Sequence, residues 1–421
     1  MPTSRFSLQL YFFALVGVVG ILTTQGVVIA FGLMGLIATG VAWFWNRVAL
    51  EELDYERIFS QSRTFAGEEL GMTTTLTNKK LVPLPWVKIT DVVPKQLDLI
   101  RGDGDIDKRI ILTQTLRQST SIAWYERVSW DYRMQCTSRG LFRLGPAQLE
   151  SGDPFGFLGN RLRSFDTEDV LVYPRVVPLE ELGIPPGRPL GEVRSGLRIY
   201  QDPSRPSGIR DYQLGDPLKT VDWKTTARMQ KLQVRTYEPS SHTTVILVVA
   251  VDTTSPHWAT YAPSILERIV VAAASLASYS ADKEYMLGLF TNDMPVVGHS
   301  PLSVPTGRGP EQLGAVLAAL ATVRSFAIAP MYTMLPEHAR RFPLGATLVV
   351  ATAFLPVEFV ATLSDLKKRG FKIVVLYVGE EECPDLGEGV VVHKLYRYLV
   401  DLEKSSETAA DIEEPTEAVA G

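Results

Sequence analysis

Residues 6–46 of this 421-residue chain read FSLQLYFFALVGVVGILTTQGVVIAFGLMGLIATGVAWFWN, a run without one charged side chain that sets the start of the fold. Arg5 and Arg47 bracket it. A membrane-spanning helix needs about 20 apolar residues, and this run has room for two, on either side of the polar turn Thr23–Gly26. We therefore predict a membrane anchor made of two helices, Phe6–Leu22 and Val27–Trp45.

The placement of cations predicts the orientation of this anchor. Lysine and arginine favour the cytoplasmic side of a membrane, and Arg5 and Arg47 flank the two helices while the turn between them carries no cation. We expect both termini and all later domains to lie in the cytoplasm, with the lipid bilayer as a partner. The alternatives are a cleaved signal peptide, whose apolar core spans only about 7–15 residues, or such a peptide followed by one span.

The composition of the whole chain excludes several functional classes. A net charge of −5 leaves no protein-wide basic field, so nucleic acid is not an expected partner. Cys136 and Cys383 stand far apart and are expected to be free thiols, which agrees with a reducing compartment. The sequence has neither a zinc-binding spacing nor a GxxxxGKS/T loop, so we expect no zinc site and no P-loop hydrolysis of nucleotides.

Residues 49–180 have the pattern of a β-rich domain. Short alternating runs separated by turn signals predict strands arranged as a β-sandwich. The expected strands are Glu69–Thr77, Trp86–Val92, Arg109–Thr115, Ser121–Met134 and one inside Ser138–Pro146 that is entered and left by glycine.

Two motifs in this region invite a functional interpretation. Asp103, Asp105 and Asp107 resemble the start of a calcium loop, but the glycine and glutamate that an EF-hand needs further on are missing, so we favour a solvated hairpin tip. Residues 153–157 read DPFGF, which predicts a turn stabilised by the aspartate. Its two phenylalanines are expected to anchor the turn on a neighbouring core, with docking of a partner as the alternative.

Residues 188–235 are a basic segment in an acidic protein. They contain ten lysine or arginine residues and five acidic residues, a local charge of +5. Asp216 followed by Pro217 predicts the start of a helix that continues to Ala227, capped by the carboxylate. Arg–Asp pairs are expected among Arg210, Asp211, Asp222 and Arg228, because such charges are costly to bury unpaired. The segment is either a salt-bridged structural clasp or an interaction surface for an acidic or polymeric partner.

The centre of this segment resembles a known family. Residues 208–216 read GIRDYQLGD, residues 221–228 read VDWKTTAR and residues 232–238 read LQVRTYE, a pattern similar to the domain of unknown function 58 family. The apolar N-terminal run, the β-rich region and the DPFGF turn also resemble the usual arrangement of that family. The resemblance implies an adaptor that partners a MoxR-type AAA+ ATPase in assembling or maturing protein complexes. We assign the interaction role to the motif residues Arg210, Asp211, Tyr212, Gly215, Asp216, Asp222, Trp223, Lys224 and Arg228.

Strand and helix patterns alternate from residue 245 to residue 378, which predicts a mostly parallel sheet with helices on both faces. The family resemblance implies a von Willebrand factor type A-like fold for this α/β domain. The expected strands are Val245–Val251, Tyr285–Phe290, Thr347–Ala353 and Phe371–Val378, and the expected helices are Ala262–Ser280, Pro310–Arg324 and Val357–Arg369.

Domains of that kind often bind a divalent ion after the first strand, through a D-x-S-x-S loop and two later oxygen ligands. Asp252 and Thr254 match this loop in type, and oxygen ligands suit Mg²⁺. However, Pro256 removes the third oxygen of the loop, and Ala353 stands where a later carboxylate is expected. Thr306 is the candidate for the later threonine. We therefore expect no cofactor, with Mg²⁺ as the alternative.

These patterns divide the chain into four segments: an anchor at 1–48, a β-rich domain at 49–180, the family-like segment with its α/β domain at 181–401, and an acidic disordered tail at 402–421. The favoured function is a membrane-tethered adaptor that is not an enzyme. One alternative is a metal-dependent ligand-binding module. Another is a hydrolase with Asp211 and Asp222 as paired acid and base, although nearby arginines would hold both carboxylates ionised.

Overall fold

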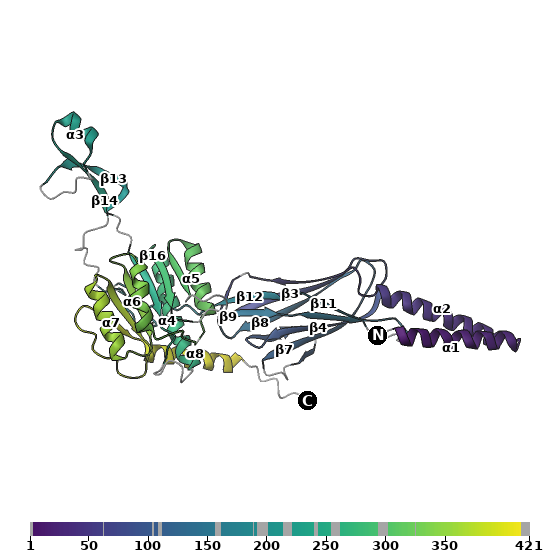
Figure 1. The fold of residues 1–421 in the computed structure, drawn as a ribbon. Coiled ribbons are helices and arrows are strands. Elements are labelled where there is room, and N and C mark those ends of the chain that lie inside the picture. The colour runs from purple at the N-terminus through teal and green to yellow at the C-terminus, as the bar shows by residue number, and fades with distance from the viewer. Residues whose placement is uncertain are drawn as a thin grey trace. The chain divides into compact units, whose positions relative to one another are not determined.

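The computed structural model describes residues 3–61, 63–102, 105–107, 112–155, 161–187, 189–191, 201–213, 221–239, 243–253, 262–293, 302–324 and 326–413. The chain forms two compact units, Met1–Arg175 and Val176–Gly421. Figure 1 labels their helices and strands.

Two apolar helices begin the first unit. α1 (Thr3–Leu22) and α2 (Gly26–Val48) are joined by a short turn in which Thr24 has a left-handed backbone, φ 51°. The helices approach closely at glycines, since a Cβ added to Gly32 would stand 2.7 Å from the Cα of Gly17. Within the described residues, α2 is the one helix long and apolar enough to cross a membrane, and Phe6–Leu22 is a shorter apolar helix.

The sheet-rich region follows the helices. It contains a four-stranded sheet of order β1-β3-β8-β5, a five-stranded sheet of order β11-β10-β4-β7-β6 and a small sheet of order β2-β12-β9. The strands are β1 (Leu53–Phe59), β2 (Thr64–Phe65), β3 (Glu69–Asn78), β4 (Leu84–Pro94), β5 (Leu97–Gly102), β6 (Asp105–Asp107), β7 (Thr113–Ile122), β8 (Arg127–Cys136), β9 (Gly140–Leu144), β10 (Ala147–Ser151), β11 (Arg161–Phe165) and β12 (Glu168–Tyr173).

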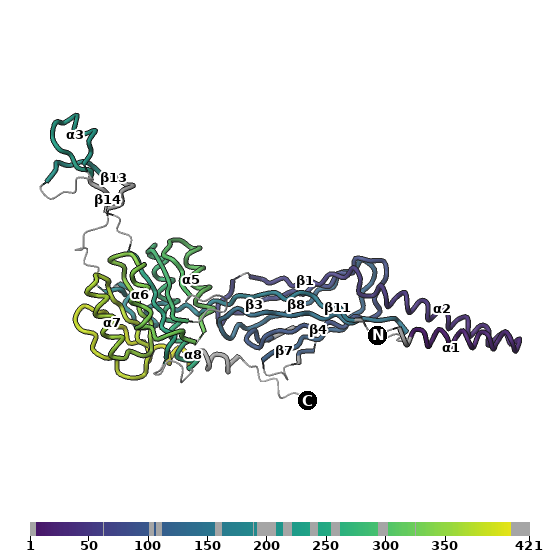
Figure 2. The backbone as a smooth tube through the Cα atoms, viewed as in Figure 1, coloured from purple at the N-terminus to yellow at the C-terminus, as the bar shows by residue number. Residues whose placement is uncertain are grey.

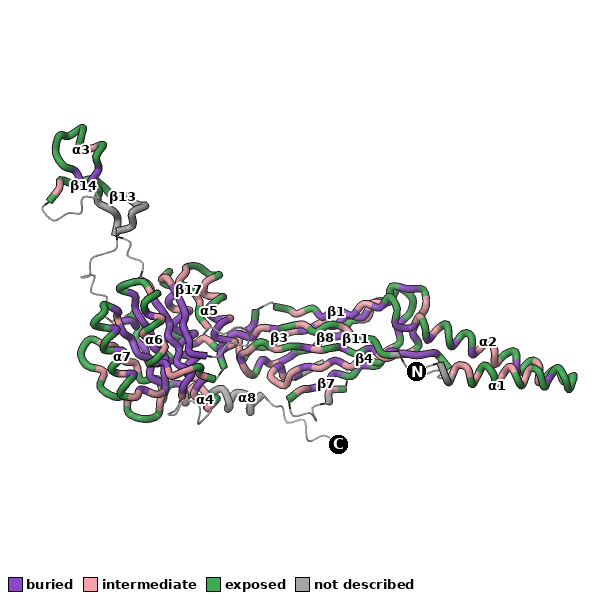
Figure 3. The backbone as a smooth tube through the Cα atoms, in the orientation of Figure 1, coloured by how far each residue is buried: buried purple, intermediate pink, exposed green. Residues whose placement is uncertain are grey.

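The two large sheets share one apolar core. Leu70 and Met72 of β3, in the first sheet, belong to the same buried cluster as Val87 and Ile89 of β4, in the second. Burial along these strands has the period of two that a pleated strand imposes, as the alternating colours in Figure 3 show. The prediction of a many-stranded, sheet-rich middle region is confirmed.

A buried ion pair bridges the two large sheets. Arg57 of β1 donates from Nε to Oδ2 of Asp91 of β4 at 2.8 Å and from a terminal nitrogen to Oδ1 at 2.9 Å. The side chains are only 2% and 1% exposed. The Tyr55 hydroxyl also donates to Asp91 Oδ2, at 3.0 Å, and burial raises the pKa of Tyr55 far above its ordinary value. No local pattern in the sequence indicates this ion pair, because Arg57 and Asp91 are 34 residues apart.

Some predicted strands need correction. Ser121–Met134 is not one strand, because β7 ends and β8 begins within it, on either side of a turn in which Tyr125 has φ 53°. The turn carries strand-favouring aromatic residues, which hid it in the pattern. Of the predicted strand Arg109–Thr115, residues 109–111 lie outside the described residues, and β7 begins at Thr113 and runs on to Ile122. The strand between glycines is confirmed as β9.

The two motifs of this region have different outcomes. Asp105 and Asp107 lie in the edge strand β6, paired with β7, rather than in a hairpin tip, while Asp103 lies outside the described residues. At the DPFGF turn the buried Asp153 accepts a hydrogen bond from the backbone nitrogen of Phe155 at 3.0 Å, as predicted. Phe155 itself is exposed, so the prediction that it anchors the turn on a core is wrong; the second phenylalanine of the motif lies outside the described residues.

The second unit contains a six-stranded sheet of order β17-β16-β15-β18-β19-β20. Neighbouring strands pair in parallel except β17, which is antiparallel to β16. The strands are β15 (Thr244–Val249), β16 (Met286–Thr291), β17 (Ser303–Gly307), β18 (Thr347–Thr352), β19 (Lys372–Tyr377) and β20 (Val391–Lys394), and the helices are α4 (Pro263–Asp282), α5 (Pro310–Thr322), α6 (Met331–His338), the 3-10 turn η2 (Ala339–Arg341), α7 (Val357–Lys368) and α8 (Tyr396–Glu413).

Helices cover both faces of this sheet. Ile246 and Val248 of β15 belong to the buried cluster that includes α6 and α7. Because side chains alternate along a strand, Val245, Leu247 and Val249 point to the opposite face, where α4 contacts β15 (Figure 1). The α/β region is confirmed, and its predicted strands and helices agree with the observed ones to within two residues at each end.

The acidic tail needs correction. Helix α8 continues to Glu413, so a disordered tail beginning at Leu402 is wrong for residues 402–413, and the rest lies outside the described residues. The helix is fixed to the domain by the buried Leu399 and by an ion pair of 2.6 Å between Arg268 and Glu403. Sequence composition hid this helix because the residues from Leu402 onward are mostly acidic or small.

Candidate interaction module and sheet edge

The basic segment folds into a small module of two strands and one helix. β13 (Gln201–Asp211) pairs in antiparallel fashion with β14 (Gln233–Pro239), and α3 (Trp223–Met229) lies between them in the chain (Figure 1). Val221 forms a β-bridge with Val234 just before the helix, and both side chains are buried. We call residues 208–213 and 221–235 the charged module.

Asp222 fixes the start of α3. Its Oδ1 accepts hydrogen bonds from the backbone nitrogens of Lys224 at 3.0 Å and Thr225 at 3.1 Å, the geometry of a helix N-cap. Its Oδ2 accepts from Arg235 Nε at 2.8 Å. The hydrogen bond from Thr225, followed by that from Arg235, holds the pKa of Asp222 below its ordinary value. This carboxylate is therefore ionised at neutral pH and stabilises the module.

The helix begins later than the sequence predicted. Val221 lies in a β-bridge and the backbone of Asp222 is extended, so a continuous helix from Asp216 to Ala227 is wrong. Gly215 and Asp216 lie outside the described residues. The prediction placed the cap at the aspartate before proline, whereas the bridge to β14 makes the next aspartate the cap.

The motif residues at the end of β13 are hydrogen-bonded to β14 and to the residue before it. Asp211 is opposite Gln233, whose side-chain amide donates to the Asp211 carboxylate. Tyr212 donates from its backbone nitrogen to the carbonyl of Leu232 at 2.9 Å, and Arg210 donates to the Asp211 carbonyl at 3.1 Å. Different residues of β14 therefore hold Asp211 and the capping aspartate. This arrangement does not favour their use as a paired acid and base.

The helix of the module faces solvent. None of the seven residues of α3 is buried, and Trp223 at its first position is 66% exposed. Met229 at its last position and Leu232 just beyond are also exposed. Lys224 and Arg228 are exposed one turn apart on the same face, and within the described part of the chain neither forms an ion pair. The charged module therefore presents apolar groups beside cations.

A second candidate site lies at the carboxyl edge of β15. Asp252 is buried there, and its two oxygens accept hydrogen bonds from the Asn292 side-chain nitrogen at 2.8 Å and the Met331 backbone nitrogen at 3.4 Å. Asn292 also accepts from the Val251 backbone nitrogen at 2.9 Å and donates to the Ala329 carbonyl at 2.9 Å. The network joins β15, β16 and the start of α6. It was not found from the sequence, because its members are 40 to 79 residues apart.

Of the predicted metal ligands, the structure describes Asp252 and Thr306. Thr254 lies outside the described residues. Thr306 lies in β17 beside Gly288, in the first half of β16, and so far from the carboxyl edge at which Asp252 stands. The Asn292 amide nitrogen, a donor, faces the Asp252 carboxylate, so this donor set does not fit Mg²⁺. Among the described residues no group of three or more His, Cys, Asp or Glu side chains could hold a metal ion.

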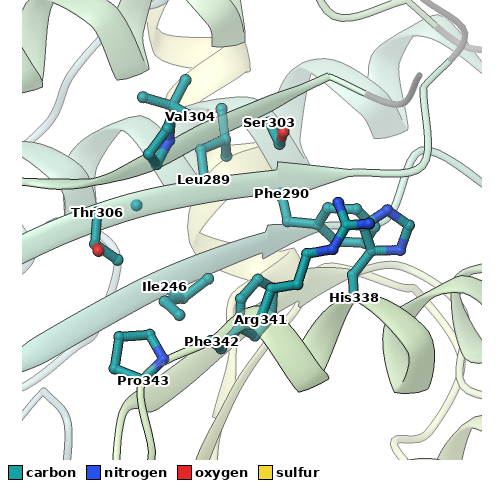
Figure 4. A pocket seen from close by; sticks show the side chains of 12 residues that line it. Ile246, Leu289, Phe290, Ser303, Val304, Thr306, His338, Arg341, Phe342 and Pro343 are labelled. Carbon is teal, nitrogen blue, oxygen red and sulfur yellow. The ribbon is translucent and has the colours of Figure 1, made fainter. Parts of the chain in front are cut away.

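A cavity of about 250 Å³ lies elsewhere on the sheet, lined by β15, β16, β17 and the segment from His338 to Pro343. The His338 ring packs 4.4 Å from the Phe290 ring, and its Nδ1 lies 3.1 Å from the Met334 carbonyl. Figure 4 shows Arg341 beside His338 at the cavity. Sequence reasoning did not single out these residues because one histidine and one arginine form no motif.

The charged module and the α/β sheet together match one family model, described as "Protein of unknown function DUF58", over residues 208–414. The resemblance seen in the motif is confirmed over these residues.

A curated relative is "Uncharacterized protein YeaD" of Bacillus subtilis (strain 168), which is 25% identical over 210 residues. The alignment covers 48% of this chain and 48% of that protein, so the chain spans about half the length of the curated relative it matches.

Solved structures give weaker likenesses. Domains D2 and D3 of the major pilin SpaD from Corynebacterium diphtheriae match at a TM-score of 0.22 and 10% identity, over 28% of this chain and 52% of that one. The seventh ScaB type I cohesin from Pseudobacteroides cellulosolvens matches at a TM-score of 0.19 and 10% identity, over 30% of this chain and 95% of that one. Likenesses of this size carry no argument about function.

Proposed function

We propose that this protein is a non-catalytic, membrane-tethered adaptor whose charged module binds a partner protein. One observation carries the proposal: α3 buries none of its residues, yet Asp222 and Arg235 hold it in a fixed position. The helix exposes Trp223 with Lys224 and Arg228 nearby. Tryptophan and arginine are enriched among the residues that contribute most to protein–protein binding.

The proposed tether has two membrane spans. Helix α2 satisfies the length and hydropathy of a span, and we count the shorter α1 as the returning span because the two helices pack at Gly17 and Gly32. Small residues at such contacts are typical of helix pairs in membranes. Arg5 and Arg47 flank the pair, which favours a cytoplasmic location for the remaining domains.

The proposed platform is a von Willebrand factor type A-like domain. The support is the strand order β17-β16-β15-β18-β19-β20, in which an antiparallel edge strand adjoins an otherwise parallel sheet covered by helices on both faces. We propose that it acts without a metal, because Asp252 stabilises the start of α6 instead.

The proposed partner is a MoxR-type AAA+ ATPase. The family resemblance implies it, and the family match covers the whole charged module. In this proposal the partner supplies ATP hydrolysis, and the adaptor holds the complex at the membrane for assembly or maturation of other proteins.

The test is co-purification of the tagged full-length protein with a purified MoxR-type ATPase in detergent. Trp223→Ser should weaken binding by about 30-fold or more, since an interface tryptophan contributes about 2 kcal/mol. Arg228→Glu should weaken it most at low salt. Phe326→Ser is the matched control, because Phe326 is also aromatic and 69% exposed but lies outside the charged module. Equal binding by all variants, or no binding at all, would refute the proposal.

A further inference from the structure

One turn of the sheet-rich region is hydrogen-bonded to the end of α2. Lys80 Nζ, in the turn between β3 and β4, donates to the carbonyl of Ala49 at 2.6 Å and to that of Glu51. The backbone nitrogen of Lys79 donates to the carbonyl of Glu52 at 3.0 Å. These acceptors follow directly on α2, so the turn is fixed at the level where that helix ends. Figure 2 shows α2 meeting the sheets at one end of their strands.

Two more turns lie at this end. The buried Asn78 side chain donates to the carbonyls of Val82 at 3.0 Å and Ala123 at 2.8 Å, and so joins the β3–β4 turn to the β7–β8 turn. Ser151, the last residue of β10, pairs with Val87 near the start of β4, which places the turn after β10 at the same end. We call residues 79–83, 123–126 and 152–155 the anchor-proximal turns.

Each anchor-proximal turn exposes a large apolar or aromatic side chain. These are Leu81, Trp124, Tyr125 and Phe155, all more than half exposed. Their backbones are held in place: the Tyr125 nitrogen donates to the Lys80 carbonyl at 3.3 Å, and the Phe155 nitrogen donates to the buried Asp153. Several large apolar groups that gather on one surface mark a site of interaction.

We propose that the anchor-proximal turns enter the lipid headgroup layer around α2. The protein would then contact the membrane through these three turns as well as through its helices. This inference rests on the membrane anchoring in the proposed function. Lipid is the occupant because the surface is continuous with the end of the helix that crosses the bilayer, to which Lys80 joins it. Tryptophan and tyrosine prefer this layer because their rings are apolar and their edges polar.

The test uses spin labels on the full-length protein in phosphatidylcholine–phosphatidylglycerol vesicles. Labels are attached to single cysteines that replace Leu81, Trp124 or Phe155, with Cys383→Ser to remove the partly exposed native thiol. The matched control is a label at Leu112, which is 69% exposed but lies at the opposite end of the sheets, where its carbonyl accepts from Lys95.

The labels at positions 81, 124 and 155 should be less accessible to a water-soluble nickel complex, and more accessible to oxygen, than the label at position 112, which stays in water. Trp124→Asp should move the label at Leu81 into water, whereas Leu112→Asp should leave it unchanged. If all labels stay in water while alkaline washing leaves the protein in the vesicles, the inference fails and the anchoring stands. If the protein washes off the vesicles, both fail. Immobilisation of these labels only after a partner protein is added would also overturn the inference.

Discussion

Asp91→Leu should destabilise the sheet-rich region by about 5 kcal/mol. The substitution removes the carboxylate that pairs with Arg57 and accepts from the Tyr55 hydroxyl between the two large sheets. Arg57 would keep Glu168 as its nearest acid, at 3.6 Å, on a side chain that is partly in solvent. The guanidinium would therefore remain buried without its main partner.

The magnitude follows from these contacts. Leaving one member of a buried ion pair unpaired costs about 3–5 kcal/mol, and orphaning a buried hydroxyl donor adds about 1–3 kcal/mol. Replacing all three groups together, as Tyr55→Phe, Arg57→Met and Asp91→Leu, removes both penalties because no buried polar group is left behind. We expect the triple variant to lie within about 2 kcal/mol of the natural protein. The exposed pair Arg143–Asp169 is the control, and Asp169→Ala should cause no measurable change.

Hydrogen exchange measured by mass spectrometry on the detergent-solubilised full-length protein tests this. In the single variant, amides of β1, β3 and β4 should exchange about three to four orders of magnitude faster, because each 1.4 kcal/mol is about tenfold. Amides of β15 and β18, in the other unit, should not change. A triple variant as unstable as the single one would refute the reasoning, since the loss would then not come from an unpaired buried charge.

Three further predictions concern other parts of the chain. Burial lowers the pKa of Lys80 to about 8, so the unfolded chain holds a proton that the folded one lacks between about pH 8 and 10.5. The free energy of unfolding should therefore rise with pH across this window, by at most about 1.4 kcal/mol per pH unit. In Lys80→Met the thermal midpoint should rise less steeply with pH than in the natural protein. Equal slopes of thermal midpoint against pH in the two proteins would contradict this. Millimolar Mg²⁺ should leave the thermal midpoint of the α/β region unchanged. Asp252→Ala should lower the stability of this region by about 1–3 kcal/mol, because the Asn292 amide loses its acceptor. A thermal midpoint that rises with Mg²⁺ in the natural protein but not in Asp252→Ala would instead support a metal site. Gly32→Ile should destabilise the packing of α1 on α2 by about 1–3 kcal/mol, because the larger side chain would collide with Gly17. The loss should be measurable as faster hydrogen exchange of α1 and α2 in lipid nanodiscs. Unchanged exchange would show that the helices do not need this contact.

The parts of the fold that the sequence predicted well are those in which one physical signal dominates. Val245–Val251 is apolar at every position because the strand is covered on both faces, and α4 and α7 follow with clear helical periodicity. Local signals failed where two signals compete. Trp124 and Tyr125 favour strands, yet they form a turn, and α8 is too acidic in composition to read as a docked helix.

The candidate sites were harder to predict, because their geometry depends on pairing between distant segments. The sequence named Asp222 and the need for an arginine, but not Arg235, since that choice depends on the β-bridge between Val221 and Val234. It named Asp252 but not Asn292, which reaches the same edge only after the parallel sheet forms. The sequence can therefore indicate which residues belong to a site without indicating which distant residues bind them.

The charged module and the anchor-proximal turns follow the same construction. In each, a buried or capped polar side chain fixes the backbone, as Asp222 does at α3 and Asn78 does at the turns. The exposed position is then given to an aromatic residue, Trp223 in one and Trp124 in the other. In both places the carboxylates and amides hold the backbone while the large apolar side chains face outward.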